Sequence, residues 1–384
     1  MKLGFFTMPM HPIGKDWQQS LREDREAFIL ADELGFVEGY CGEHSTDPEE
    51  NITSSAIFMA TLAHATRRIK LGTGTLNMPN HHPAAVASEI AMLDHLLGGR
   101  FILGISPGAL PSDSEVFGNM DMARPAMFLE AINQVLQIWA SEPPYNIQGQ
   151  FWNISSARTH IPETGMGTIP KPLQRPHPPI VVTAVAPFSQ GIAEAAARGW
   201  EPISANFLLP NWVRTHWTKY VEGCERTGRV ADAANWRVAK TVFVAKDDAT
   251  AKAYAMDPAG PYHYYYNTLF KKLKRRGALG VFKSDPQMPD DQVTLEGVME
   301  QLVIHGSPGR VVEKLHEFRE VTGDFGTLLY AGVDWKDPAL ARTYATVEAL
   351  KQPAEMARFI RWVQTKPDAF FEKSRKSQRL KSKR

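Results

Sequence analysis

Apolar and polar positions follow two alternating patterns along the chain. A short apolar run ends in a turn, and a longer stretch follows in which apolar residues recur at helical spacing. The first pattern predicts a buried strand, and the second predicts an amphipathic helix. The predicted strands span residues 3–8, 37–41, 69–76, 101–105, 179–183, 201–206, 236–245 and 326–331. The predicted helices span residues 17–35, 54–65, 83–97, 124–139, 189–198, 211–226, 308–321 and 338–350.

The repeated order of strand and helix predicts an α/β fold, with parallel strands covered by helices. Eight predicted strands favour a closed (β/α)8 TIM barrel, formed as a single domain by residues 1–350. An open, doubly wound sheet is the alternative. If such a sheet bound a dinucleotide, a GxGxxG motif should follow its first strand, and the residues after 3–8 contain none.

Two segments interrupt the alternation, 143–176 and 260–297. The first is rich in proline and glycine, and the second has a run of tyrosines followed by a basic run. Long insertions in compact domains are often lids or binding loops, so we expect 260–297 to be mobile and to close over a site. A solvated surface loop is the alternative. Beyond the barrel we expect a helical extension over 351–372 and a disordered basic tail over 373–384.

Composition narrows the possible partners and the compartment. The chain has 43% hydrophobic and 22% charged residues, which is ordinary for a globular protein, and its net charge is +1. This balance gives no general attraction to nucleic acid or to an anionic membrane. The two cysteines form no CxxC motif, and we see neither a signal-peptide pattern nor an apolar run of membrane-spanning length. We therefore expect a cytoplasmic protein that binds neither nucleic acid nor membrane.

The most informative stretch is Glu43-His44, directly after the strand 37–41. Two titratable side chains suit the rim of a barrel, where strand ends carry the chemistry. A neutral imidazole at His44 could take up and return a proton near neutral pH, and Glu43 could orient its ring. A structural histidine bonded to a backbone carbonyl is the alternative.

Several stretches together resemble the flavin-dependent monooxygenases of the bacterial luciferase family, nearest its diketocamphane and limonene monooxygenase-like group. The stretches are Gly42-Glu43-His44, Glu50-Asn51-Ile52, 71–76, 80–83, 92–95, 99–104, 108–111, Gly149-Gln150-Phe151-Trp152 and 305–308. The resemblance implies a (β/α)8 barrel that receives reduced FMN from a separate flavin reductase and reacts it with O2. It further implies oxygenation of a small apolar substrate through a C4a-peroxyflavin, by Baeyer–Villiger oxidation or by alkene or heteroatom oxygenation. We also expect a homodimer.

The resemblance places a non-prolyl cis peptide at Gly74-Thr75, against the flavin ring. It also places Ser106 and Gly108 beside the cofactor. The family has Cys and Arg at 106 and 107, whereas this chain has Ser106-Pro107, so a reactive thiol and the expected phosphate-binding Arg are missing. Arg124 is a second candidate cation for the phosphate, although a structural ion pair is the preferred interpretation.

As a replacement phosphate site we predict the helix start at Ser189 and Gln190, because backbone N–H groups at a helix N-terminus suit a phosphate. Ala184, at the end of the preceding strand, completes the predicted cofactor-binding set. Phe6, Met8, Phe207 and Leu208 lie at strand ends and could line an apolar substrate pocket.

Metal binding is not expected, because the pair His81-His82 has no third ligand at a fitting spacing. Three other functions stay open: hydride transfer with the deazaflavin F420 on the same fold, flavin binding without turnover, and an aldolase-type lyase. The lyase would need a Schiff-base lysine at a strand end, and we find none at the ends of the first six strands.

Overall fold

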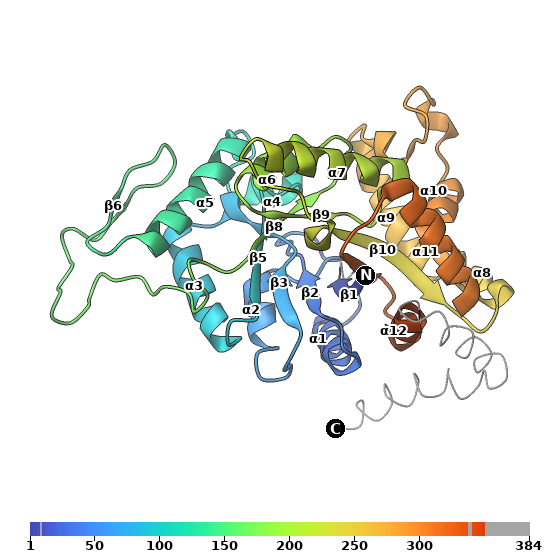
Figure 1. Ribbon diagram of the computed structural model, residues 1–384, viewed down its shortest axis with the longest axis horizontal. Coiled ribbons are helices and arrows are strands. Elements are labelled where there is room, and N and C mark those ends of the chain that lie inside the picture. Colours follow the sequence, from blue (N-terminus) through green and yellow to red (C-terminus); the bar gives the residue numbers. More distant parts are fainter. Residues whose placement is uncertain (8–9, 337–339, 350–384) are drawn as a thin grey trace.

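A computed structural model of the chain describes residues 1–7, 10–336 and 340–349. Eight parallel strands close into a barrel at its centre (Figure 1), because β12 pairs with both β1 and β10, and β10 also pairs with β9. In barrel order the strands are β1 (Lys2–Thr7), β2 (Glu38–Cys41), β3 (Lys70–Thr73), β5 (Phe101–Ser106), β8 (Ile180–Ala184), β9 (Glu201–Ser204), β10 (Arg237–Val244) and β12 (Thr327–Gly332). The predicted (β/α)8 barrel is confirmed.

Two further strands extend this barrel. After a short break, β4 (Leu76–Asn77) follows β3 and pairs with β5. The second half of β10 pairs with β11 (Val303–Gly306), a strand that the hydrophobic pattern did not predict.

Helices cover the outside of the barrel (Figure 1). They include α1 (Trp17–Leu34), α2 (Ser55–Ala60), α3 (Pro83–Leu96), α5 (Arg124–Ala140), α6 (Gln190–Ala197), α7 (Pro210–Glu225), α8 (Asp248–Ala255), α11 (Pro308–Thr322) and α12 (Leu340–Ala349). Local chemistry fixes their ends: the Asp16 carboxylate caps α1 by accepting from the Gln19 N–H, and Gly35 ends it at φ +100°. No helix in the described ranges combines the length and apolarity needed to cross a membrane.

The segment 143–176 extends away from the barrel on the left of Figure 1 and carries a small hairpin, β6 (Asn146–Ile147) with β7 (Ile154–Ser155). Two carboxylates tie it down. Glu130 accepts from the backbone N–H groups of residues 150–152, and Asp94 accepts from both the backbone and the side-chain amide of Gln174.

The segment 260–297 is largely helical rather than the long loop that its composition suggested. It contains α9 (Pro261–Arg275) and the start of α10 (Leu295–Leu302). Tyr262, Tyr265 and Tyr266 are fully buried, because their spacing places them on the core-facing side of α9. Closure of this segment over a site stays a prediction. The expected extension 351–372 and tail 373–384 lie outside the described residues.

Large side chains fill one layer of the barrel interior, and small residues occupy the next layer toward the carboxyl ends of the strands. Inward-facing Phe6, Tyr40, Ile102, Val181, Ile203, Ala239 and Leu329 form one buried layer. Alternate residues of a strand face the same side, so the next inward positions toward the carboxyl ends of four successive strands are Gly42, Gly74, Gly104 and Thr183. Three of these four positions at the mouth of the barrel therefore carry no side chain, above the buried layer.

A buried ion cluster closes the opposite end of the barrel. The Arg237 guanidinium donates to both carboxylate oxygens of Glu38, at 2.6 and 3.1 Å, and to Glu201 at 2.6 Å. All three residues stand at the first positions of their strands. The functional end is therefore the carboxyl-terminal mouth, as is usual for this fold.

Candidate active site

The peptide bond between Gly74 and Thr75 is cis, as predicted. The Thr75 hydroxyl donates to the Ser106 hydroxyl at 2.6 Å, and Ser106 donates onward to the Asn77 side chain at 3.1 Å. The Gly108 N–H also donates to the Ser106 hydroxyl, at 3.1 Å. Thr75, Ser106 and Gly108 therefore lie together on one rim of the barrel mouth, and their contact with a cofactor stays a prediction.

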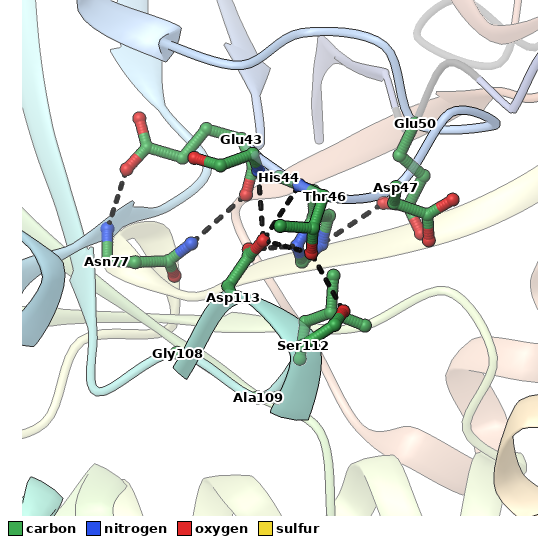
Figure 2. A network of polar contacts seen from close by, with 12 residues as sticks. Glu43, His44, Thr46, Asp47, Glu50, Asn77, Gly108, Ala109, Ser112 and Asp113 are labelled. Atoms are coloured by element: carbon green, nitrogen blue, oxygen red, sulfur yellow. Dashed lines mark hydrogen bonds and ion pairs between the residues drawn. The ribbon is translucent and has the colours of Figure 1, made fainter. Parts of the chain in front are cut away.

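His44 lies between two carboxylates, at the rim just beyond β2 (Figure 2). Its Nδ1 is 3.2 Å from an oxygen of Asp113, and its Nε2 is 3.2 Å from an oxygen of Glu50. Asp113 belongs to α4 (Pro111–Val116), which follows β5, and its second oxygen accepts from the backbone N–H groups of Ser45 and Thr46. The imidazole is mostly buried, with 21% of its side chain exposed.

This environment makes His44 a cation, not the neutral base that the sequence suggested. Burial alone would lower the pKa of the imidazole, but the charges and hydrogen bonds of Glu50 and Asp113 outweigh it and raise the pKa to about 10. Burial would raise the pKa of Glu50, but His44, and after it Lys272, lower this pKa to about 2. His44 therefore donates from both ring nitrogens near neutral pH.

Glu43 does not orient His44, which corrects the second catalytic prediction. One oxygen of its carboxylate accepts from the Asn77 N–H and from His81 Nε2, and the other accepts from the backbone and hydroxyl of Ser55. Figure 2 shows Glu43 reaching toward Asn77, away from Asp113. The reason is local: neighbouring residues leave a strand end in different directions. Glu43 fixes the connection after β4, and Glu50 and Asp113 hold the imidazole.

Sequence analysis did not identify Glu50 or Asp113 as functional residues. A signal for both was present, because each follows the carboxyl end of a barrel strand, where this fold gathers its chemistry. What the sequence could not show is that Asp113, 69 positions after His44, meets its imidazole.

The phosphate site at the N-terminus of α6 stays a prediction, and its two residues differ in whether their side chains are already bonded. The Ser189 side chain makes no capping bond to α6, so its hydroxyl is free of that task. The Gln190 side chain accepts from Lys219 at 3.2 Å and is therefore partly occupied. Ala184 is a correction: its side chain packs outside the barrel with Ile192, because alternation turns Thr183 inward instead.

Arg124 has no carboxylate among its described hydrogen-bond partners, which corrects its interpretation as an ion pair. Its guanidinium donates to the Asn119 side chain and to the Pro107 carbonyl, both neutral acceptors. It lies so close to Gly108 that a Cβ there would stand 2.7 Å from it. Arg124 therefore places a positive charge beside position 107, where the family has an arginine and this chain has a proline.

His216, which sequence analysis had not singled out, secures the connection between β8 and α6. Its Nε2 donates to the Ala186 carbonyl at 2.8 Å, and its Nδ1 accepts from the Ser204 hydroxyl at 2.8 Å. Burial lowers the pKa of His216 to about 4, so it stays neutral. Thr215, next to it on α7, accepts from the Phe188 N–H at 2.8 Å. Together they fix the backbone that leads to Ser189.

The predicted substrate residues occupy different environments. Phe6 belongs to the buried layer beneath the mouth, whereas Phe207 and Leu208 pack in the larger core around the barrel. Met8 lies outside the described residues. The lining role of these four residues stays a prediction.

Glycine backbone and a free hydroxyl mark the mouth of the barrel. Gly42 and Gly74 directly follow β2 and β3, and Gly104 lies on β5. A Cβ at Gly74 would stand 2.9 Å from Phe6 and Tyr40, so these positions admit no side chain. The Thr183 hydroxyl is buried without a hydrogen-bond partner among the described residues, so it is available to a ligand. Lys240, the lysine of β10, faces outward beside Asn206 and Leu208 carbonyls and does not reach the mouth.

Residues 1–324 match the luciferase-like monooxygenase family. The chain belongs to this family. It is 31% identical over 369 residues to 4-hydroxyprotoasukamycin monooxygenase of Streptomyces nodosus subsp. asukaensis, covering 94% of this chain and 91% of the relative. It is 27% identical to limonene 1,2-monooxygenase of Rhodococcus erythropolis, covering 88% and 82%.

A solved luciferase-like structure is similar over most of the chain. It is the oxygenating constituent of 3,6-diketocamphane monooxygenase from Pseudomonas putida, a type II Baeyer–Villiger monooxygenase in complex with FMN. The TM-score is 0.80 at 28% identity, covering 88% of this chain and 94% of that one. The resemblance found in the sequence, down to the diketocamphane and limonene group, is confirmed.

Proposed function

We propose that this protein is the oxygenating component of a two-component monooxygenase that uses reduced FMN and O2. The observation that carries the proposal is the arrangement at the mouth: glycine backbone beside the Gly74–Thr75 cis peptide, with a protonated His44 at its rim. Its membership of the luciferase-like family supports the reaction class. The substrate is a small apolar molecule, oxygenated as a ketone in the Baeyer–Villiger manner or at an alkene or heteroatom.

Each part of the mouth has a role in holding the cofactor. Gly74, Thr75 and the unpaired Thr183 hydroxyl would meet the ring, and Arg124, with the N-terminus of α6 at Ser189, would meet the phosphate. When bound, reduced FMN supplies the electrons that activate O2. The layer of Phe6 and Tyr40 beneath closes the barrel to water from the other end.

His44 then acts as a donor and not as a base. An imidazolium with a pKa of about 10 stabilises negative charge that develops on oxygen and can release its proton to it. Asp113 fixes the ring through Nδ1, because its second oxygen is itself held by the N–H groups of Ser45 and Thr46. Glu50 faces Nε2 on the other side and keeps the ring charged. The two carboxylates thus hold a cationic ring at the rim, where its charge acts on the reacting group.

The partners follow from the same proposal. A separate flavin reductase supplies reduced FMN, and the protein works in the cytoplasm. A homodimer is supported by exposed apolar side chains on α2 and α3, which pack against each other: Ile57, Met92 and Leu96 are 72%, 60% and 43% exposed.

The test is isotope incorporation. The protein is mixed with photoreduced FMN, ¹⁸O2 and a panel of cyclic ketones, terpenes and sulfides, and the products are analysed by mass spectrometry. We expect a product that carries one ¹⁸O atom and depends on reduced FMN. Absence of labelled product across the panel, together with reduction of substrate by reduced F420, would contradict the proposal and support the hydride-transfer alternative.

A further inference from the structure

Helix α9 presents a stripe of polar side chains to the connection that carries His44. Tyr264, Thr268 and Lys272, with Arg276 directly after the helix, are spaced four residues apart and share one face. Tyr264 and Thr268 donate to Glu49, and Arg276 donates to the Ala109 carbonyl at 3.1 Å. Tyr262 and Tyr266 are buried on another face of α9, so the helix is also held from the core side.

Lys272 is the member of this stripe that reaches the His44 centre. Its ammonium group forms ion pairs with Asp47 and with one oxygen of Glu50, the latter at 3.2 Å. The other oxygen of Glu50 contacts His44. One carboxylate therefore joins Lys272 to His44, and the exposed fractions of the Asp47 and Glu50 side chains are only 7% and 11%.

The charges of this cluster require a second cation. Asp47, Glu50 and Asp113 bring three carboxylates to one half-buried place: His44 contacts Glu50 and Asp113, and Lys272 contacts Asp47 and Glu50. Arg124 lies near enough to Asp113 for their charges to interact, but it forms no ion pair with Asp47 or Glu50 among the described residues. Without Lys272, Asp47 would lose its ion pair, and Glu50 would keep the one with His44. Tyr265 of α9 also lies near Glu50, and its pKa is raised, first by burial and further by nearby Tyr266 and Glu50. Neighbouring carboxylates with few cationic partners repel each other, so one of them takes up a proton or the two move apart.

We propose that Lys272 is a positioning residue for the active site, which holds Glu50 ionised and in place beside His44. The inserted helix α9 thereby becomes part of the catalytic apparatus, and activity depends on its docking against residues 44–50. This inference rests on the proposed function, in which His44 serves the oxygenation, but its first test needs neither cofactor nor substrate.

The first experiment follows the His44 ring by nitrogen-15 NMR in the cofactor-free protein, from about pH 3.5 to 6, with folding checked by circular dichroism. In the native protein the ring signals should stay flat, because the pKa of Glu50 lies at about 2, below this range. In Lys272→Met that pKa rises toward its ordinary value, so an inflection should enter the range. Lys272→Arg should restore the flat profile, and Lys271→Met, an exposed lysine beside it, should leave the profile unchanged.

A second measurement uses the loaded enzyme with photoreduced FMN. We expect Lys272→Met to lower product per reduced flavin by about tenfold or more, because displacement of a reacting group is costly, and Lys272→Arg to recover most of it. A flat NMR profile in Lys272→Met overturns the inference, whether or not the protein melts earlier. If the native protein itself yields no oxygenated product, the proposed function fails, while the NMR result still decides what Lys272 does.

Discussion

His44 and Asp113, 69 residues apart in the chain, meet at 3.2 Å between Nδ1 and a carboxylate oxygen. The second oxygen of Asp113 binds the N–H groups of Ser45 and Thr46, so one carboxylate fixes both the backbone and the ring of the same connection. A carboxylate held by several N–H donors stays ionised, and an ionised Asp113 keeps His44 charged. The charge on His44 is therefore built into the fold.

This charge predicts how stability depends on pH. The pKa of His44 is raised from 6.5 to about 10, so its ion pairs stabilise the folded protein fully below about pH 6.5 and are lost as pH rises through about 10. In Asp113→Asn we expect a lower pKa for His44 and a loss of about 2 kcal/mol at pH 6.5 that shrinks by pH 10. Urea unfolding at several pH values, with NMR of the His44 ring, measures both. An equal loss at both pH values would mean that Asp113 acts only through its backbone bonds.

The sequence was sufficient to predict the barrel, because alternating strands and helices leave few ways to pack. It also located the rim residues Gly74, Thr75, Ser106 and Gly108 through a family resemblance. It could not give the charge of His44, which depends on Glu50 and Asp113 arriving from other connections. Nor did it show α9 as a wall of the site, since its tyrosines and lysines were interpreted as an insertion and not as two faces of one helix.

Glu43→Gln tests whether Glu43 stabilises the fold without taking part in catalysis. The carboxylate accepts from Ser55, Asn77 and His81, and an amide would place an N–H₂ group against at least one of these donors. We expect a loss of about 2 kcal/mol in the free energy of unfolding, the usual scale for an unsatisfied buried group. The pKa of His44 and the product formed per reduced FMN should stay near those of the native protein. A His44 pKa that falls with this substitution would restore Glu43 as the orienting residue.

Arg124→Gln tests how the phosphate is bound. The guanidinium now donates to neutral acceptors and stands against Gly108, so it is available to a dianion. We expect reduced FMN to bind about tenfold more weakly, as for loss of one charged hydrogen bond, whereas reduced riboflavin, which has no phosphate, should bind as before. Anaerobic calorimetry measures both.

Two controls sharpen the Arg124 test. Arg158→Gln removes an exposed arginine of the segment 143–176 and should change neither the affinity for reduced FMN nor that for reduced riboflavin. Ser189→Ala examines the N-terminus of α6 in the same way. If Arg124→Gln weakens FMN and riboflavin equally, Arg124 shapes the ring site, and the phosphate assignment is wrong.

We expect the protein to become more stable when the buried Lys240 is replaced by an apolar residue. The lysine is fully buried on the outer face of β10, where its hydrogen-bond acceptors among the described residues are the Asn206 and Leu208 carbonyls, at 3.4 and 3.5 Å, and its ammonium group lies 5.0 Å from the centre of the Phe318 ring. Burial lowers the pKa of Lys240 from 10.5 to about 7, so the unfolded chain holds a proton that the folded protein gives up between these values. The free energy of unfolding therefore falls as pH drops from about 10.5 to 7 and is affected no further below that.

Lys240→Met keeps the volume and removes this penalty. We expect a gain of about 2–4 kcal/mol near pH 7 and almost none above pH 10, where the lysine is neutral in both states. Denaturant unfolding of the native protein, Lys240→Met and Lys246→Met at pH 7 and 10.5 measures the difference, with exposed Lys246 as the matched control. A Lys240→Met protein that is less stable than the native one at pH 7 would show that the two carbonyls hold a charged ammonium, and that the amine ties the connection after β9 to the barrel.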